Sequence, residues 1–223
     1  MPVSVSLPNS NLKNEVSDFK RRRIREEASH LFFELGYEGT TLDAIAQRLE
    51  VTKPYLYTHY ANKAELLHDI CSTGIQESLK AIDGVLGDTG LSPGLGLERL
   101  VESVVGIILD FQEFIVVYVR EEKNLQPEQA RQIREQRSLF DHRLATLLEQ
   151  GNRAGEFLVN EPALTANTIG GIMTWVALWY RPGGKWSRHQ IVEHTLRTVL
   201  ALVQTGQTTD ESTGPRARQV GMS

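Results

Sequence analysis

The chain has 223 residues and carries 24 Lys and Arg against 28 Asp and Glu, which gives a formal net charge of −4. No apolar run reaches the roughly 18 residues of a transmembrane helix, and residues 1–13 lack the basic start and apolar core of a secretion signal. The single cysteine, Cys71, can form no internal disulfide. We therefore expect a cytoplasmic protein that has no membrane partner.

The charge is distributed unevenly along the chain. Residues 1–63 contain 9 Lys and Arg against 8 Asp and Glu, whereas residues 64–223 contain 15 against 20. The densest basic cluster, residues 20–25, lies in the first part. This asymmetry indicates a small module that meets an anion, followed by a larger acidic body. A short basic run is also common on an ordinary solvated helix face, so a motif is needed beside it.

Helical periodicity runs through nearly the whole chain, and strand alternation is absent. We expect a flexible arm at residues 1–17, which are polar and contain two prolines. We expect a disordered tail at residues 206–223, which are rich in Thr, Ser and Gly. Between them the pattern predicts an all-α protein of about nine helices.

The first predicted helix covers residues 18–35. Its apolar side chains, among them Ile24, Ala28 and Leu31, recur at spacings of three and four and lie on one face. Gly36 follows the last of them and is typical of a helix C-terminus.

Two short helices follow, at residues 42–49 and 53–60. Thr41 and Thr52 stand where their hydroxyls can cap the two N-termini. Pro54 lies in the first turn of the second helix, where proline is tolerated.

Asn62 and Glu65 have the spacing of a capping box and predict the start of a fourth helix, which ends near Gly84. Proline and glycine breaks divide the rest of the chain into five more helices. Their expected spans are 96–113, 115–124, 127–151, 162–181 and 187–205.

The two short helices, joined by a tight turn between Thr41 and Tyr60, have the form of a helix-turn-helix. In such a unit the first helix crosses the DNA backbone, and the second enters the major groove. Free backbone N–H groups at the helix N-termini favour phosphate there.

The region 28–67 resembles the DNA-binding domain of TetR-family transcriptional repressors. The resemblance implies an all-α fold with a three-helix helix-turn-helix domain at 18–63 and a larger ligand-binding and dimerisation domain at 64–205. Two stretches, 49–51 and 53–55, depart from the common family pattern and affect the helix that reads the operator. The residues that carry the resemblance are Phe33, Gly36-Tyr37, Gly39-Thr40-Thr41, Ile45-Ala46, Val51-Thr52-Lys53, Leu56-Tyr57, His59-Tyr60, Asn62-Lys63 and Glu65-Leu66.

The resemblance also implies which residues contact a double-stranded DNA operator. Lys53, Tyr55 and Thr58 would meet base edges. Phosphate contacts are expected from a second group, and the basic run would reach the adjacent backbone or minor groove. Those phosphate contacts are Tyr57, His59, Thr41, Thr52 and Lys63, and the basic run is represented by Arg21 and Arg22.

Some of these residues have an alternative interpretation. His59 could be an ordinary surface histidine, and Tyr60 is expected in the core. The basic run Arg21 to Arg23 is equally compatible with a solvated helix face.

The larger part of the chain contains no catalytic constellation. The six histidines lack close metal-ligand spacing on one helix face, and a glycine-rich phosphate loop is absent. We therefore expect neither an enzyme nor a bound metal, and no cofactor other than a small-molecule effector.

Aromatic residues are concentrated in this larger part. Hydrophobic core explains most of them, but in the TetR family this region encloses a pocket for a small hydrophobic effector. The predicted pocket residues are Phe111, Phe114, Tyr118, Arg137, Phe140, Trp175, Trp179 and Arg181.

A second, weaker resemblance concerns the effector. The segment 175–183, with Arg134, Arg137, Phe140 and Arg143, is similar to regulators that sense acyl-CoA thioesters in fatty-acid or sterol side-chain degradation. An acyl chain would occupy the apolar channel, and arginines such as Arg137 or Arg181 would meet the CoA phosphates. The alternative for Arg134 and Arg137 is pairing with glutamates on the helix surface.

The last two helices have apolar faces wider than one core contact needs. The family resemblance implies that they pair with the same helices of a second subunit, so that a homodimer reads a palindromic operator. A small-molecule-binding helical protein without operator-specific DNA binding is the alternative. The apolar positions are Ile169, Ile172, Met173, Val176, Ile191, Thr195, Leu196, Val199 and Leu202.

Overall fold

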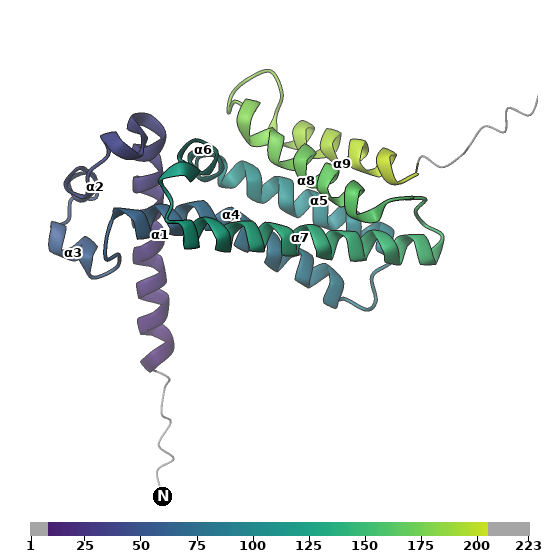
Figure 1. Ribbon diagram of the computed structural model, residues 1–223, viewed down its shortest axis with the longest axis horizontal. Helices are drawn as coiled ribbons and strands as arrows, with labels where there is room; N and C mark the ends of the chain where they lie inside the picture. Colours follow the sequence, from purple (N-terminus) through teal and green to yellow (C-terminus); the bar gives the residue numbers. More distant parts are fainter. Residues whose placement is uncertain (1–8, 205–223) are drawn as a thin grey trace, which may run out of the picture.

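The computed structural model describes residues 9–204, and within this range it contains nine α-helices, one 3₁₀-helix and no strand (Figure 1). The expected all-α fold is confirmed. The predicted tail at 206–223 lies outside the described residues. The helices are α1 (Asn9–Gly39), α2 (Leu42–Arg48), α3 (Lys53–Tyr57), α4 (Lys63–Gly87), α5 (Pro93–Asp110), α6 (Gln112–Glu121), α7 (Pro127–Ala154), α8 (Pro162–Trp179) and α9 (Arg188–Gln204), with the 3₁₀-helix η1 (Glu122–Asn124) after α6.

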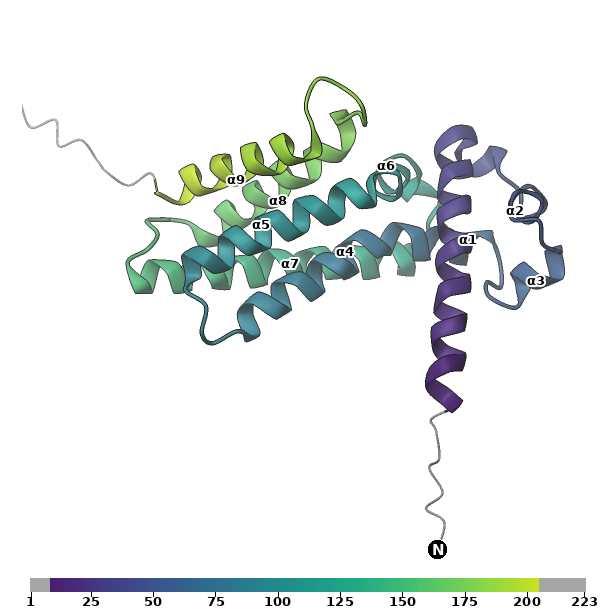
Figure 2. The ribbon, with the colours of Figure 1, turned by 180° about the vertical axis from the view of Figure 1, so that it is seen from behind.

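The helices form a small head and an elongated body. In both Figure 1 and Figure 2, α1 stands across the direction of the long helices, and α2 and α3 lie on its outer side. Helix α4 leaves this head and enters the body, where it packs against α5, α6 and α7. No helix in residues 9–204 is long and apolar enough to cross a lipid bilayer.

Helix α1 is longer than its sequence pattern predicts. It begins at Asn9, so residues 9–17, which we expected in a flexible arm, are helical. The segment after Pro8 contains no further proline or glycine before Gly36, so nothing in it interrupts helical hydrogen bonding. The stop at Gly36 is confirmed, because this residue has φ 73° and ψ 168° inside an otherwise helical run.

Two of the predicted caps explain where α2 and α4 start. Thr41 Oγ1 accepts the Ala44 N–H at 3.1 Å and caps α2, and Asn62 Oδ1 accepts the Glu65 N–H at 2.8 Å and caps α4. The Glu65 carboxylate binds the Ala61 N–H at 2.7 Å rather than that of Asn62. Thr52 takes the cap position of α3 without a side-chain cap bond.

Helix α3 is shorter than expected and ends at Tyr57. The Thr58 hydroxyl donates to the Tyr55 carbonyl at 2.7 Å, and the Tyr60 N–H closes one further turn onto the Leu56 carbonyl at 3.0 Å. The chain therefore leaves the helix through an irregular turn that still buries Tyr60.

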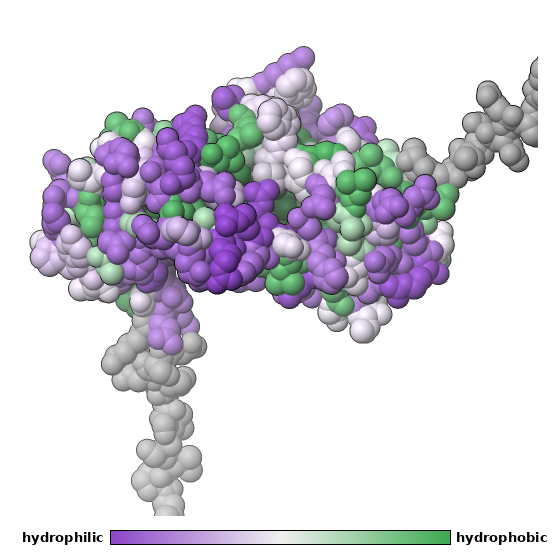
Figure 3. All heavy atoms as spheres, viewed as in Figure 1, coloured by the Kyte–Doolittle hydropathy of each residue, from purple (hydrophilic) through white to green (hydrophobic). Residues whose placement is uncertain are grey.

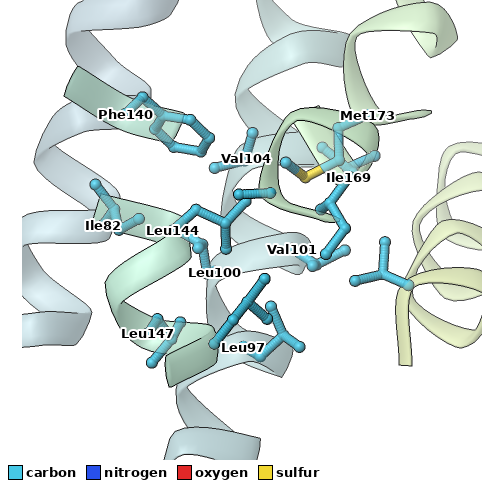
Figure 4. Close-up of a cluster of buried hydrophobic side chains, with 14 of the residues drawn as sticks. Ile82, Leu97, Leu100, Val101, Val104, Phe140, Leu144, Leu147, Ile169 and Met173 are labelled. Carbon is cyan, nitrogen blue, oxygen red and sulfur yellow. The ribbon is translucent and has the colours of Figure 1, made fainter. Parts of the chain in front are cut away.

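Two hydrophobic cores hold the molecule together. The body core joins side chains of α4, α5, α7, α8 and α9, and Figure 4 shows Val104, Phe140 and Leu144 converging at its centre. The head core is built on Ile24, Phe32 and Ile45, and it extends beyond residue 63. Its further members include Leu66, Ile70, Phe114, Val117 and Ile133 from α4, α6 and α7.

Polar contacts between α1 and α6 add to this junction. The Tyr37 N–H donates to Glu121 Oε1 at 3.2 Å, and His30 Nδ1 lies 3.0 Å from Glu113 Oε2. The head is therefore packed directly onto two helices of the body, α4 and α6.

Candidate DNA-binding surface and interior cavity

The outer surface of the head presents the short helix α3. Lys53, Tyr57 and Thr58 are exposed, and Tyr57 retains 50% of its accessible surface. Thr52 is exposed at the N-terminus of α3, where its hydroxyl makes no cap bond. This combination of free hydroxyl, aromatic ring and cation on one short helix suits the major groove.

Lys53 is paired across the turn between the two short helices. Its Nζ donates to Asp43 Oδ2 at 2.8 Å, and both side chains are exposed. The hydrogen bond and the charge of Asp43 raise the pKa of Lys53. Asp43, which lies in the first turn of α2, therefore holds the lysine that we expect to meet bases.

Asp43→Asn is expected to strengthen DNA binding about fivefold at low salt, because it removes one negative charge next to Lys53 and the duplex. The slope of the logarithm of the binding constant against the logarithm of the salt concentration should become steeper by about one, because Lys53 is then free to contact a phosphate and release one counterion. Fluorescence anisotropy of an operator duplex across a salt series measures both.

Asp88→Asn provides the matched control. Asp88 is an exposed carboxylate, and its nearest cation is Arg99 of the body at 3.7 Å. It should leave DNA affinity unchanged. An Asp43→Asn protein that binds no better than the wild type would contradict the placement of Lys53 at the duplex.

Tyr55 and His59 are both half-buried behind the exposed face of α3. Their rings meet edge to face with centroids 5.1 Å apart, and Lys20 Nζ lies 5.8 Å from the Tyr55 centroid. Burial, followed by the charges of Lys20 and Arg21, lowers the pKa of His59. Tyr57 is thus the more exposed of the two tyrosines, and the assignment of Tyr55 to a base edge and of Tyr57 to a phosphate stays a prediction.

Lys63 is bound to its own chain. Its Nζ donates to the Tyr37 carbonyl at 2.7 Å and to the Thr40 carbonyl at 2.9 Å, and it lies 4.1 Å from the centroid of the Tyr37 ring. These bonds fix the turn between α1 and α2. Only the third N–H of the ammonium group is left for the predicted phosphate contact.

Arg21 is half-buried, and its guanidinium is engaged by other groups of the head. Its guanidinium donates to the His59 carbonyl at 2.8 Å and to Asp69 Oδ2 at 3.1 Å, and it stacks 4.3 Å from the centroid of the Tyr60 ring. The predicted contact of Arg21 with DNA is therefore not supported by its position. Arg22 is exposed and lies over the Phe19 ring at 5.4 Å, so it stays available.

Asp69, which the sequence analysis missed, is the centre of this network. It accepts hydrogen bonds from Arg21, from Arg25 Nη1 at 3.1 Å and from the Tyr60 hydroxyl at 2.5 Å. Burial alone would raise the pKa of Asp69, but the Tyr60 hydrogen bond and the two arginines outweigh it and hold that pKa below its ordinary value. Burial and the same hydrogen bond raise the pKa of Tyr60.

The body contains a mostly apolar cavity of about 100 Å³ between α4, α5, α6, α7 and α8, and this cavity is open on one side. Of the predicted pocket residues, Phe114, Tyr118, Arg137 and Phe140 line it. Phe111 does not line it, and its ring contacts that of Phe114 with centroids 5.4 Å apart. The remaining lining residues are Ile70, Cys71, Gly74, Ile75, Ser78, Val104, Ile108, Ile115, Ile133, Asp141, Gly170, Met173 and Thr174.

Three of the predicted pocket residues lie elsewhere. Trp175 keeps 61% of its surface exposed, and Trp179 meets Trp186 edge to face with centroids 6.1 Å apart on the outside of the body. Arg181 donates to the carbonyls of Leu178 and Tyr180 at the end of its own helix. Helix α8 is apolar on more than one face, so its sequence did not reveal which face turns inward.

Helix α4, which supplies more lining residues than any other helix, was not predicted as part of the wall. On α4, Ile70, Gly74 and Ser78 recur at spacings of four, with Cys71 and Ile75 beside them. The signal in the sequence was the change from large to small side chains along one helical face, which leaves a hollow where the rest of the core is filled. Burial raises the pKa of the Cys71 thiol, which makes this cysteine an inert wall residue.

A polar, open groove of about 580 Å³ continues from the cavity along α7. The two share three residues, Tyr118, Arg137 and Asp141, which form a neck between them. Burial raises the pKa of Asp141 against the opposing effect of Arg137. The groove is lined further by Glu122, Arg134, Ser138, His142, Ala145, Ala163 and Asn167.

An apolar stripe runs along the outside of α8. Leu164, Gly171, Trp175 and Trp179 recur at helical spacing and are exposed. Hydrophobic patches appear on the upper part of the body, where α8 and α9 lie (Figure 3). Of the apolar positions that we expected to face a second subunit, six are buried in their own chain, Ile172 and Leu196 are half-buried, and Leu202 is exposed. The six buried positions are Ile169, Met173, Val176, Ile191, Thr195 and Val199.

Two family profiles match the chain. Residues 24–70 match the family described as bacterial regulatory proteins, tetR family. Residues 91–203 match the family described as the tetracyclin repressor-like C-terminal domain. Together they cover the second half of α1, the two short helices and most of the body.

The chain is 27% identical over 186 residues to the HTH-type transcriptional repressor KstR2 of Mycobacterium tuberculosis strain H37Rv. The aligned region covers 81% of this chain and 91% of that protein. The TetR family transcriptional regulator PfmR from Thermus thermophilus has a TM-score of 0.73 at 27% identity, over 80% of this chain and 97% of that chain. A structure of AibR in complex with isovaleryl coenzyme A and operator DNA has a TM-score of 0.67 over 80% and 96%, but at 23% identity it shows the fold alone.

Proposed function

Because the chain belongs to the tetR family of bacterial regulatory proteins, we propose that it is a homodimeric repressor of a palindromic operator, released by an acyl-CoA thioester. The observation that carries the effector assignment is the two-part cavity. Its apolar inner part and its polar outer groove meet at one neck, formed by Tyr118, Arg137 and Asp141.

The DNA-binding part of the proposal rests on α3. Lys53, Tyr57, Thr52 and Thr58 are exposed on or beside this helix. A helix of five residues reads few bases, so specificity requires two copies on two half-sites. The acidic body offers little attraction for the duplex, and the few cations of the head would carry the contact.

The effector part rests on complementary chemistry. An acyl chain is apolar and fits a cavity walled by residues such as Ile75, Phe114 and Phe140. Coenzyme A carries phosphates, for which Arg134 and Arg137 of the groove provide guanidinium groups. In the AibR complex the bound molecule is isovaleryl coenzyme A, a compound of this class.

The coupling part rests on α4. Ile70 and Cys71 line the cavity and directly follow Asp69, which binds Arg21 and Tyr60 of the head. An effector that fits the cavity in one arrangement of α4 better than in another would shift the population of head orientations. Such a shift changes the distance between the two α3 helices of a dimer and thereby the fit to the operator.

Arg137→Gln tests the proposal. Operator binding without effector should be unchanged, whereas the acyl-CoA concentration needed for release should rise by about tenfold or more, because a charge-assisted hydrogen bond is lost. Native mass spectrometry of the purified wild type should show a co-purified acyl-CoA. Fluorescence anisotropy of DNA from the promoter of the chain's own gene measures binding and release.

Arg131→Gln is the matched control. Arg131 lies on the same helix and pairs with Glu128 and Glu135 on the surface, outside both cavities. It should behave as the wild type. Failure to bind any promoter DNA would favour a small-molecule-binding protein without an operator. Release that is identical in wild type and Arg137→Gln would contradict the effector assignment.

A further inference from the structure

The inner cavity is small for a ligand site. Its volume is about 100 Å³, whereas pockets for drug-sized ligands measure about 300–1,000 Å³. A cavity of about 150 Å³ holds one benzene ring, which corresponds to about 25 Å³ for each carbon. By the same measure the inner cavity accepts about four carbons.

The walls of the cavity resist enlargement because they belong to both hydrophobic cores. Val104, Ile108 and Phe140 are buried members of the body core, and Phe114 and Ile133 are buried members of the head core. Protein interiors are close-packed, so pushing such side chains apart distorts their neighbours. A longer chain therefore cannot be admitted by a small adjustment of one wall residue.

The neck limits the length of the acyl chain at the other end of the cavity. Asp141 is half-buried there, and its Oδ1 lies 3.3 Å from the position that a Cβ at Gly170 would occupy. Arg137 and Tyr118 complete the neck, and Arg137 lies 5.7 Å from the centroid of the Tyr118 ring. Methylene groups at this level would displace water from a carboxylate and a guanidinium without replacing its hydrogen bonds. A thioester carbonyl or an amide, in contrast, can bond to them.

We infer that the effector carries a short acyl chain of about four or five carbons, with its polar remainder in the outer groove. The inference rests on the proposed acyl-CoA effector and narrows it. It excludes long-chain fatty acyl groups. It also excludes sterol-derived acyl groups, because a fused ring system has several times the volume of the cavity.

Titration calorimetry with a series of CoA thioesters tests the inference. Free CoA, acetyl-CoA, butyryl-CoA, isovaleryl-CoA, octanoyl-CoA and palmitoyl-CoA serve as probes. Butyryl-CoA should bind about 15-fold tighter than acetyl-CoA, since each buried methylene contributes about fourfold. Octanoyl-CoA and palmitoyl-CoA should bind at least about tenfold more weakly than the optimum, because they overfill the cavity.

Two variants on α4 should change the acyl-chain length that binds most tightly, in opposite directions. A Cβ at Gly74 would lie 3.5 Å from Ile115 Cγ1 inside the cavity, so Gly74→Ala removes volume without a clash and should favour a chain about one carbon shorter. Ile75→Ala removes three side-chain carbons from the wall and enlarges the cavity by about their volume, so it should favour octanoyl-CoA over butyryl-CoA.

Each variant has a control on the same helix. Gly84→Ala makes the same change in helix propensity where nothing lies within 4 Å. Leu79→Ala truncates a half-buried side chain outside the cavity lining. Both controls should keep the chain-length preference of the wild type, which separates an effect of cavity volume from an effect on stability.

The outcomes separate this inference from the function on which it rests. Tighter binding of octanoyl-CoA or palmitoyl-CoA by the wild type overturns the short-chain inference and leaves an acyl-CoA effector intact. Equal binding of all thioesters and free CoA also overturns it, because the acyl group would then lie outside the cavity. Binding of none of the probes overturns both the inference and the proposed effector.

Discussion

If the stripe on α8 forms the interface of the proposed homodimer, replacing Trp175 by glutamate is expected to separate the two subunits and to weaken operator binding by at least about a hundredfold. Trp175 lies in the middle of the stripe on α8 and is 61% exposed in the single chain. A buried tryptophan at the centre of an interface is among the side chains whose loss costs most. A glutamate at a two-fold interface places two like charges near each other in an apolar setting.

The effect on DNA follows from the short recognition helix. One copy of α3, with five residues, makes few contacts, so the affinity of the dimer depends on both heads binding the same duplex. When one head is bound, the second binds with a high effective concentration, and this advantage disappears in the monomer. The loss should therefore be much larger for a palindrome than for a duplex with a single half-site.

Analytical ultracentrifugation gives the oligomeric state, and fluorescence anisotropy gives the operator affinity. Leu139→Glu is the matched control, because Leu139 is an exposed apolar residue, 41% accessible, on α7. It should remain dimeric and bind DNA. Circular dichroism should show that Trp175→Glu melts as the wild type does. A folded Trp175→Glu dimer would show that the interface lies on another face.

Local features of the fold were predictable from the sequence. The caps at Thr41 and Asn62 and the stop at Gly36 each depend on a few neighbouring residues, so side-chain chemistry was enough to place them. The starts of α7 and α8 at Pro127 and Pro162 were found for the same reason.

Contacts between distant residues were not predictable in this way. The pair Arg21 and Asp69 is separated by 48 positions, and nothing near either residue indicates its partner. The prediction that Trp175 lines the pocket was wrong for a related reason. Helix α8 is apolar on both its inner and outer faces, and only its packing decides which face is buried. The cavity arises where five helices fail to fill the space between them, which no single periodicity encodes.

Asp69→Asn is expected to destabilise the protein by about 2–3 kcal/mol at neutral pH. The Asp69 side chain is 17% exposed and binds two arginines and a tyrosine hydroxyl. An asparagine keeps the shape but removes the charge, which leaves Arg21 and Arg25 without a counterion in a half-buried site. The arginine side chains are 35% and 23% exposed, so solvent reduces the effect below that of a fully buried pair.

The dependence on pH distinguishes this role from simple packing. The pKa of Asp69 is lowered in the folded protein. The carboxylate therefore stabilises the fold above its unfolded pKa of about 3.9, and this contribution is lost as the pH falls through the folded pKa. The difference in unfolding free energy between wild type and Asp69→Asn should consequently be constant near pH 7 and shrink below about pH 4. Urea unfolding at several pH values measures it.

DNA binding should decline together with stability, because the same network holds the end of α3. Arg21 binds the His59 carbonyl and the Asp69 carboxylate at once, so Asp69 fixes where the chain leaves the recognition helix. Asp110→Asn is the control: it removes an exposed carboxylate, 59% accessible, that pairs with Arg188 in the body. Its effect should be at most about 1 kcal/mol, with normal operator binding. An Asp69→Asn protein that binds the operator normally would show that α3 is oriented by its own core contacts, chiefly Leu56 and Tyr60, and not by the ionic network.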